Sequence, residues 1–413
     1  MTGGHLHHGR VALYALMLSA AGIPLYIHLP QFASVHLGLS LSALGVLLLA
    51  IRLVDLVQDP LIGWAIDRWP GAQRGFALGA GLGLALGFPA LFLMDPGPGL
   101  FLRLGAVLVL LFTAFSLGTI LLYARSATLA ESPTPRALVR LAVWREAGGL
   151  AGVIVAAILP AVLVGMGAAD AGYPAFGLVL AGLALGAVAA SWPIWRRPAL
   201  PGGRLSLRGM GDAGAIRLLV LALVNGLPVA ITSTLFLFFV EDRLQAPGLA
   251  GPLLVLFFAS AGLSVPVWGR VSRSIGARRT LFVSMALAIA GFVGAAFLGP
   301  GDGAAFAAVC LATGAAMGAE AVLLPALFSV SLTRAGLNPA LAFGIWTFAG
   351  KLGLALAAFV VMPVLQWQGY QPGQANDAAA LSALGLLYAA LPCALKLAAL
   401  AMVARLPPEA DVA

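Results

Sequence analysis

The chain has 413 residues, of which 61% are hydrophobic and only 9% are charged. Soluble globular proteins carry about 25% charged residues, so this composition excludes an ordinary soluble enzyme or binding domain. The formal net charge of +8 arises from arginines that lie mostly in short segments between apolar runs, which indicates membrane topology and no nucleic-acid partner. The sequence therefore predicts an all-α polytopic membrane protein.

Twelve apolar segments of this chain are long enough to cross a bilayer as helices, which takes about 20 residues each. Segments rich in Gly and Pro separate them, and the first lacks the small-residue cleavage pattern of a signal peptide. In chain order, the predicted spans are 11–34, 40–66, 76–95, 101–129, 138–166, 173–195, 215–240, 250–271, 280–299, 304–330, 341–367 and 378–404.

The longest polar break, 196–214, predicts the division of the chain. We expect six-helix bundles at 1–195 and 215–413, joined by this break as a cytoplasmic loop. When alternate loops are assigned to opposite sides, nearly all loop arginines fall on the side that also holds both termini, which predicts cytoplasmic termini. We expect a monomer, in contact with membrane lipid, in the cytoplasmic (inner) membrane of a bacterium.

The two halves repeat a short motif. Pro60 and Gly63 end the second span, Pro266 and Gly269 end the eighth, and a basic loop containing glycine follows in each half. This six-plus-six pattern resembles the major facilitator superfamily over essentially the whole chain. The resemblance implies a solute site near the membrane midplane, between halves that rock against each other.

The second span carries Arg52, Asp55 and Asp59 at bilayer depth. A charged side chain there costs at least about 2.5 kcal/mol, and these spacings place all three on one side of a helix. The corresponding positions of the second half include the apolar Ala261 and Val265, so the repeated helix does not require the charges. Two carboxylates one turn apart can hold Na⁺ or share a proton.

Two further expectations concern this span. We expect Pro60 to break the helix just after the carboxylates and to free backbone carbonyls as ligands. We expect Lys351, in the eleventh span, to pair with Asp55 and Asp59, since a buried lysine needs a counter-charge. A static salt-bridge network of these residues with Arg52 stays open as the alternative to an ion site.

Other candidates lie in the remaining spans. Arg125 and Lys396 have long stems that can reach an interface. Glu320 is either a pathway group or a protonated carboxyl bonded to a neighbouring helix. Arg145 and Glu146 are adjacent, so we expect them to point in different directions and not to be mutual partners only. The full set is His28, Gln31, Thr119, Tyr123, Arg125, Arg145, Glu146, Glu320, Trp346, Thr347, Lys351 and Lys396.

Residues 52–63 resemble the R-x-x-D-x-x-[ND]-D-P-x-x-G signature of the glycoside–pentoside–hexuronide:cation symporters, the melibiose-permease group. This resemblance implies a cation site, for Na⁺ or H⁺, at Asp55, Asp59 and Thr119, with Gln58 in place of a commoner Asn. Na⁺ would then be the metal at this site.

The same resemblance extends to spans five and eleven. It implies that Arg145 contacts the solute and that Lys351, four residues after Thr347, links the cation and solute sites. Span four departs from the family, because Leu122 and Ser126 stand where a sugar-binding Asp and Trp are expected. Buried sugar hydroxyls need polar partners, so we expect a solute other than a standard sugar, such as an anion or an amphipath.

These observations predict a cation-coupled secondary transporter of a small organic solute, without a cofactor. The predicted substrate-binding or coupling residues are Arg52, Tyr123, Arg145, Glu146, Glu320, Trp346, Thr347 and Lys351. The alternatives are a proton-driven exporter or a lysolipid transporter, and, from another class, a non-transporting membrane sensor or assembly factor. An enzyme is not expected, since no GxSxG, P-loop or HExxH motif occurs.

Overall fold

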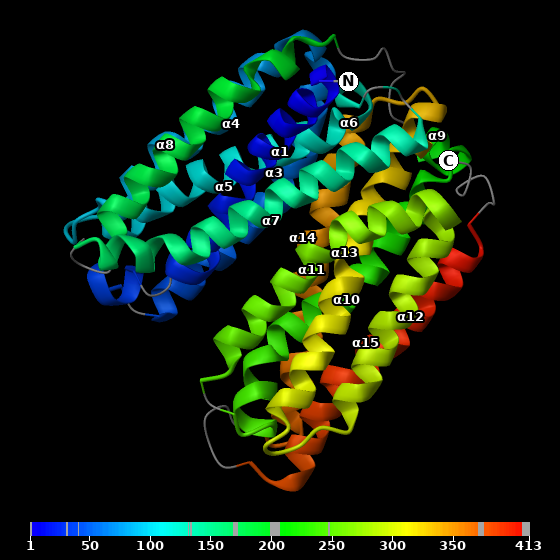
Figure 1. Cartoon of the computed structure of the whole chain (residues 1–413). Coiled ribbons are helices and arrows are strands. Elements are labelled where there is room, and N and C mark those ends of the chain that lie inside the picture. Colours follow the sequence, from blue (N-terminus) through cyan, green and yellow to red (C-terminus); the bar gives the residue numbers. More distant parts are fainter. Residues whose placement is uncertain are drawn as a thin grey trace. The chain divides into compact units, whose positions relative to one another are not determined.

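The computed structural model describes residues 2–29, 32–39, 41–130, 132, 134–167, 172–198, 207–246, 248–370 and 376–406. Figure 1 shows helices throughout these ranges, and no β-strand occurs within them. The all-α class is therefore confirmed.

The helices follow the predicted spans in order. The first six spans correspond to α1 (Thr2–Ile23), α3 (Leu41–Arg68), α4 (Gln73–Phe92), α5 (Leu100–Ala124), α7 (Pro135–Gly165) and α8 (Tyr173–Ser191). The last six correspond to α10 (Ala215–Phe238), α11 (Ala250–Ile275), α12 (Ala277–Ala296), α13 (Gly303–Arg334), α14 (Pro339–Trp367) and α15 (Ala378–Ala404). Among the described residues, nine helices are long and apolar enough to cross a membrane, and α1, α3 and α7 occupy the other predicted spans.

Short helical segments complete the chain. Two π-helical turns, Pro24–His28 and Phe32–His36, follow α1, and a third, Phe239–Arg243, follows α10. Single turns of other kinds are Pro70–Ala72, α6 (Ser126–Leu129) and Trp192–Arg196. Within the predicted central loop, the structure adds α9 (Leu207–Asp212), which the apolar pattern does not reveal.

The chain forms two compact units. Unit 1 consists of Met1–Pro133, Arg140–Ser206 and Leu332–Phe348, and unit 2 consists of Thr134–Val139, Leu207–Ser331 and Ala349–Ala413. In unit 1, α4 packs against α5 and α8, and α3 packs against α5. In unit 2, α15 packs against α10 and α12. The division into bundles on either side of 196–214 stays a prediction.

Small residues allow the helices of unit 1 to approach closely. A Cβ atom added at Gly83 of α4 would lie 2.6 Å from the Ala114 side chain of α5, and one at Gly177 of α8 would lie 2.9 Å from the Phe88 carbonyl oxygen. Close backbone approach of this kind drives helix association where lipid removes the hydrophobic advantage of packing. Unit 2 also has glycines at close helix contacts, such as Gly291, where an added Cβ would lie 2.8 Å from the Thr313 side chain. Its core contains stacked rings as well, with Phe239 and Tyr388 centred 4.1 Å apart.

The beginning of α14 crosses α3 at backbone contact inside unit 1. A Cβ atom at Gly344 would lie 2.6 Å from the carbonyl oxygen of Asp59, and one at Gly63 would collide with the carbonyl oxygen of Ala340. No side chain fits at either glycine without moving backbone. We call residues 59–67 together with 339–344 the α3–α14 seam.

A carboxylate closes one end of the α3–α14 seam. Asp67, in the last turn of α3, accepts hydrogen bonds from the backbone N–H groups of Ala340 at 3.1 Å and Leu341 at 2.8 Å. These groups belong to the first turn of α14, whose N–H groups have no acceptor within the helix. Asp67 thus caps α14 from another helix and complements the positive end of its dipole.

Pro60 does not break α3, which runs from Leu41 to Arg68 with the proline inside it, so this expectation is wrong. The other part of the expectation, a freed backbone carbonyl, follows from the residue type. Proline has no N–H, so the Leu56 carbonyl loses its usual helical donor. The helix continues because packing against neighbouring helices tolerates a proline at this position.

The α3–α14 seam generates a stability prediction. Gly344→Ala should lower the free energy of unfolding by about 2 kcal/mol, because the added methyl forces the two backbones apart. Gly350→Ala, on the same helix, is the matched control, since a Cβ there meets nothing within 4 Å. Thermal unfolding in detergent should show a lower midpoint for Gly344→Ala alone. Equal midpoints in the two variants would show that the backbone contact is unimportant.

Candidate functional site

The two carboxylates of the second span are both completely buried, at 0% exposure for Asp55 and Asp59. Asp55 accepts a hydrogen bond on each oxygen: Arg52 Nη1 lies 3.1 Å from Oδ2, and Gln58 Nε2 lies 2.7 Å from Oδ1. The three interacting residues are spaced three apart along α3 and so lie on one face. The guanidinium of Arg52 is 31% exposed, whereas the carboxylate it contacts is enclosed.

A residue that the sequence argument missed holds this group in place. Thr113 of α5 donates its hydroxyl to Gln58 Oε1 at 2.8 Å. Because the amide oxygen is engaged by Thr113, the amide nitrogen of Gln58 is directed at Asp55. The neighbouring Phe112 lies under Arg52, with its ring centre 5.1 Å from the guanidinium carbon. Helix α5 therefore supports the carboxylate helix through two consecutive residues.

Thr119 was the predicted ligand on α5. It is half-buried, six residues further along the helix than Thr113. Among the hydrogen bonds that the structure describes, none joins Thr119 to Asp55 or Asp59. Its role as a cation ligand stays a prediction, and Thr113 is the α5 residue that the geometry places in the network.

The charges of this group define what it can do. With both carboxyls ionised, Arg52, Asp55 and Asp59 together carry a net charge of −1. Hard cations such as Na⁺ take oxygen ligands, and a carboxylate pair one turn apart can also retain a proton. Either species would cancel that charge. These two capacities are what an ion-coupling site would need.

A second polar cluster in unit 1 joins Tyr123, Arg145 and Glu146. Arg145 Nε donates to Glu146 Oε1 at 2.8 Å, and the Tyr123 hydroxyl donates to the same oxygen at 3.1 Å. The guanidinium carbon lies 3.7 Å from the centre of the Tyr123 ring, which is a close cation–π contact. The expectation that Arg145 and Glu146 diverge is wrong, because their long side chains bend toward one point between α5 and α7.

The arginines of this region are buried and keep free donor capacity. Arg145 is 4% exposed, and its Nη2 group has no acceptor among the described residues, although Nη1 lies 3.5 Å from the Ser126 hydroxyl. Arg125 is also 4% exposed and does not reach an interface, and its Nε and Nη2 have no acceptor in the described structure either. Buried donors of this kind favour an anionic or polar ligand, because the N–H groups are otherwise unsatisfied.

Consecutive residues of α14 contact both clusters. The Phe343 ring centre lies 5.7 Å from that of Tyr123, while Gly344 packs on the Asp59 backbone at the α3–α14 seam. Trp346 continues the aromatic row, 6.3 Å from Phe343 between ring centres. One helix segment therefore touches the carboxylate helix and the arginine cluster at neighbouring positions.

Three further candidates lie on α14 and in the turn that follows α1. Thr347 donates its hydroxyl to the Phe343 carbonyl oxygen of its own helix at 2.9 Å. Lys351 lies half-buried one turn further along α14, and its pairing with the aspartates stays a prediction. His28 packs against the Tyr173 and Phe176 rings, and Gln31 lies outside the described residues.

Glu320 and Lys396 form an ion pair inside unit 2. Lys396 Nζ lies 2.7 Å from Glu320 Oε1 and 2.6 Å from Oε2. Asn225, which the sequence argument missed, accepts from Lys396 at 2.8 Å and donates to Glu320 Oε2 at 2.9 Å. All three residues are at most 4% exposed, so Lys396 does not reach an interface. The triad joins α10, α13 and α15.

The sequence and the fold were compared with those of known proteins. The sequence profile of the MFS/sugar transport protein family matches residues 10–409. No curated protein matches the sequence. A bacterial homologue of the iron transporter ferroportin, in the outward-facing state, superposes with a TM-score of 0.68 at 15% identity, over 95% of this chain and 99% of that chain.

Two further solved structures share the architecture. The major facilitator superfamily transporter FucP, in the outward conformation, gives a TM-score of 0.65 at 15% identity, over 97% of this chain and 99% of its own. The human organic anion transporter MFSD10 gives 0.63 at 18% identity, over 95% and 98%. At such identities the likeness shows the fold alone, and the predicted major facilitator fold is confirmed.

The buried triad generates a double-variant prediction. Lys396→Met should lower the free energy of unfolding by about 3 to 5 kcal/mol, because Glu320 then stays buried without its counter-charge. Glu320→Gln combined with Lys396→Met should recover most of that loss, since neither charge remains. Unfolding in detergent measures both. A double variant no more stable than Lys396→Met would show that the ion pair is not the source of the effect.

Proposed function

The chain belongs to the MFS/sugar transport protein family, and on that premise we propose that it is a secondary transporter that couples movement of a small organic solute to Na⁺ or H⁺. The family and fold indicate a multi-pass membrane protein that works by alternating access. We place it, as a monomer, in a bacterial cytoplasmic membrane with both termini cytoplasmic, in accord with the arginine distribution.

One observation carries the coupling proposal. Phe343 contacts Tyr123 in the arginine cluster, and the adjacent Gly344 packs on the Asp59 turn. A ligand couples to another only by favouring one arrangement of a shared element. The first turns of α14 are that element, because a solute against Tyr123 and an ion at Asp59 both act on the same two residues.

The proposed ion site centres on Asp55 and Asp59, with Gln58 orienting the first carboxylate. Full burial supports this assignment, since the ionised groups are costly at bilayer depth. Thr119 remains a proposed ligand, and Arg52 is proposed to tune the charge of the site. Na⁺ and H⁺ fit the same chemistry.

The proposed solute site centres on Tyr123, Arg145 and Glu146, with Trp346 at its apolar side. Unsatisfied donors on buried Arg145 and Arg125 favour an anionic solute. Leu122 and Ser126 lack the carboxylate and large ring that a sugar site of the related symporters would use. We therefore propose an organic anion with an apolar part, and Lys351 with Thr347 as the link to the ion site.

Sodium binding can be measured without knowing the solute. In detergent at fixed ionic strength, with choline replacing sodium, saturating Na⁺ should stabilise the wild type by about 2.7 kcal/mol at 100 times its Kd. Asp55→Asn and Asp59→Asn should each abolish this stabilisation, because the oxygen ligands lose their charge. Thermal unfolding reports the change.

Asp95→Asn is the matched control, since this exposed aspartate lies in the turn after α4 and binds Arg103 through its backbone oxygen. It should keep the full sodium response. A sodium response that survives in the Asp55→Asn, Asp59→Asn double variant would remove the carboxylates from the cation site. If no wild-type response to Na⁺ occurs but proton uptake depends on the pair, the coupling ion is H⁺.

A screen of organic anions by thermal shift, with and without Na⁺, tests the solute site. A true solute should stabilise the protein more strongly with the coupling ion present, because linkage is reciprocal. Arg145→Gln should lose the thermal shift caused by the solute and keep the one caused by the ion. Asp59→Asn should lose the shift caused by the ion and keep the one caused by the solute. Retention of the solute shift in Arg145→Gln would move the solute site elsewhere.

A further inference from the structure

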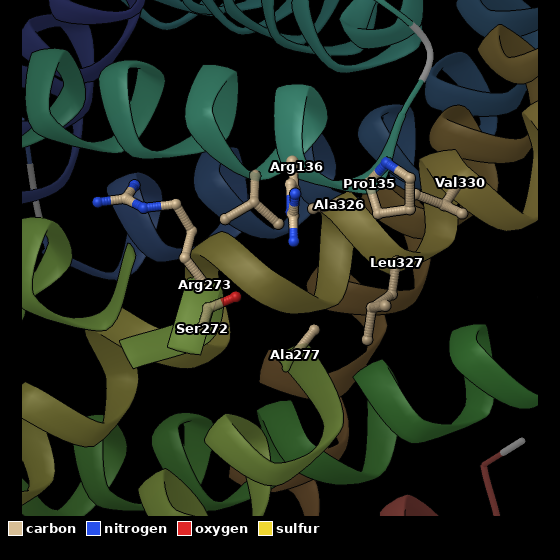
Figure 2. A pocket seen from close by; sticks show the side chains of 9 residues that line it. Pro135, Arg136, Ser272, Arg273, Ala277, Ala326, Leu327 and Val330 are labelled. Atoms are coloured by element: carbon tan, nitrogen blue, oxygen red, sulfur yellow. The ribbon is translucent and has the colours of Figure 1, made fainter. Parts of the chain in front are cut away.

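Unit 2 contains a pocket, partly open to solvent, at the ends of four helices. Figure 2 shows its walls, which come from the beginning of α7, the last turns of α11, the beginning of α12 and the C-terminal third of α13. These positions border the loops after the fourth and eighth predicted spans, on the arginine-rich side of the chain. The pocket is separate from the ion and solute clusters, which lie in unit 1.

The charge at this pocket is entirely positive. Arg136 projects from α7 into the pocket, whereas Arg273 extends from α11 at its edge with its guanidinium directed away from Arg136 (Figure 2). Both arginines are exposed, and none of the lining residues is acidic. In addition, α7 and α12 begin here, and the Gly276 cap of α12 supplies no side chain to its first N–H groups. The helix dipoles add to the positive potential.

A buried hydroxyl also faces the pocket. Ser272 is 4% exposed and lines the cavity, with its oxygen on the pocket side of α11 in Figure 2. Ser264 and Ser274 of the same helix each donate to the carbonyl oxygen three residues earlier. Within the described structure the Ser272 hydroxyl makes no such bond. A hydroxyl that lines a pocket and makes no bond to the protein is available to a ligand.

The opposite wall is apolar and consists of Ala326, Leu327 and Val330 of α13. A small inorganic anion would use the arginines and the hydroxyl but would leave this wall uncovered. A phospholipid uses both parts, since its phosphate is adjacent to a glycerol backbone and acyl chains. Basic pockets between transmembrane helices on the cytoplasmic side match anionic lipid head groups.

We propose that this pocket binds one anionic phospholipid as a resident ligand. Arg136 holds the phosphate, the exposed Arg273 side chain turns toward it on binding, and Ser272 donates its hydroxyl to a phosphate oxygen. The glycerol and first methylenes lie against Leu327 and Val330. This lipid is distinct from the transported solute, and it ties the beginning of α7 to α11 and α13 within unit 2.

Lipid binding to the purified full chain tests the proposal. The probes are short-chain phosphatidylglycerol and phosphatidylcholine with identical acyl chains, and native mass spectrometry counts bound lipid. Arg136→Gln with Arg273→Gln should weaken phosphatidylglycerol binding about 30-fold, because each arginine near an anionic lipid contributes about fivefold. Ser272→Ala should weaken it less, and no variant should change phosphatidylcholine binding.

Arg270→Gln with Arg334→Gln is the charge-matched control, since both arginines are exposed and neither lines the pocket. It should bind phosphatidylglycerol as the wild type does. An equal loss of phosphatidylglycerol binding in the control pair would overturn the proposal. The lipid would then be attracted by the overall positive charge of this face and not by the pocket. Glycerol phosphate or inorganic phosphate that competes as strongly as the lipid would overturn the lipid assignment in favour of a soluble anion. Ser272→Leu fills the pocket without removing charge, and this variant should abolish tight binding of phosphatidylglycerol.

Discussion

The α3–α14 seam is the contact on which the arrangement of the candidate site depends. Two glycines bring the helices to backbone contact, and the Asp67 carboxylate fixes the start of α14 by capping its N–H groups. Two backbones in direct contact have little freedom to adjust, because protein interiors are close-packed. Under the proposed coupling, a change at the Asp59 turn would move the first turns of α14 as one segment. The contact between Phe343 and Tyr123 would extend that movement to the arginine cluster.

Buried charges in this chain occur in two different states. In unit 2, Glu320, Lys396 and Asn225 satisfy one another, which is the condition under which a buried ion pair is tolerated. In unit 1, Arg145 keeps a buried donor without an acceptor in the described structure. A satisfied group stabilises a fold, whereas an unsatisfied one has chemistry left for a ligand. The contrast is why the site is assigned to unit 1, although both units contain buried charge.

Hydropathy and periodicity predicted the fold well, because membrane helices need long apolar segments and the loops between them need turn residues. The grouping of Arg52, Asp55 and Gln58 also follows from helical spacing. The contacts of Thr113 and Asn225 could not be predicted, because a lone polar residue in an apolar helix gives no sign of which helix it faces. Pro60 was misjudged for a related reason, since tertiary packing decides whether a proline ends a helix. For the triad of unit 2, the sequence showed only that Glu320 and Lys396 lie in separate spans, and it did not show that they pair.

The Glu320–Lys396 pair has an electrical consequence. A membrane potential does about 2.3 kcal/mol of work per elementary charge per 100 mV. A tightly bonded pair of opposite charges carries no net charge, so moving it through the field requires almost no work. Voltage dependence of transport would then report the charges around Asp55 and Asp59, Lys351 and the bound ion or solute. The triad therefore contributes no net charge to any movement of unit 2 through the membrane field.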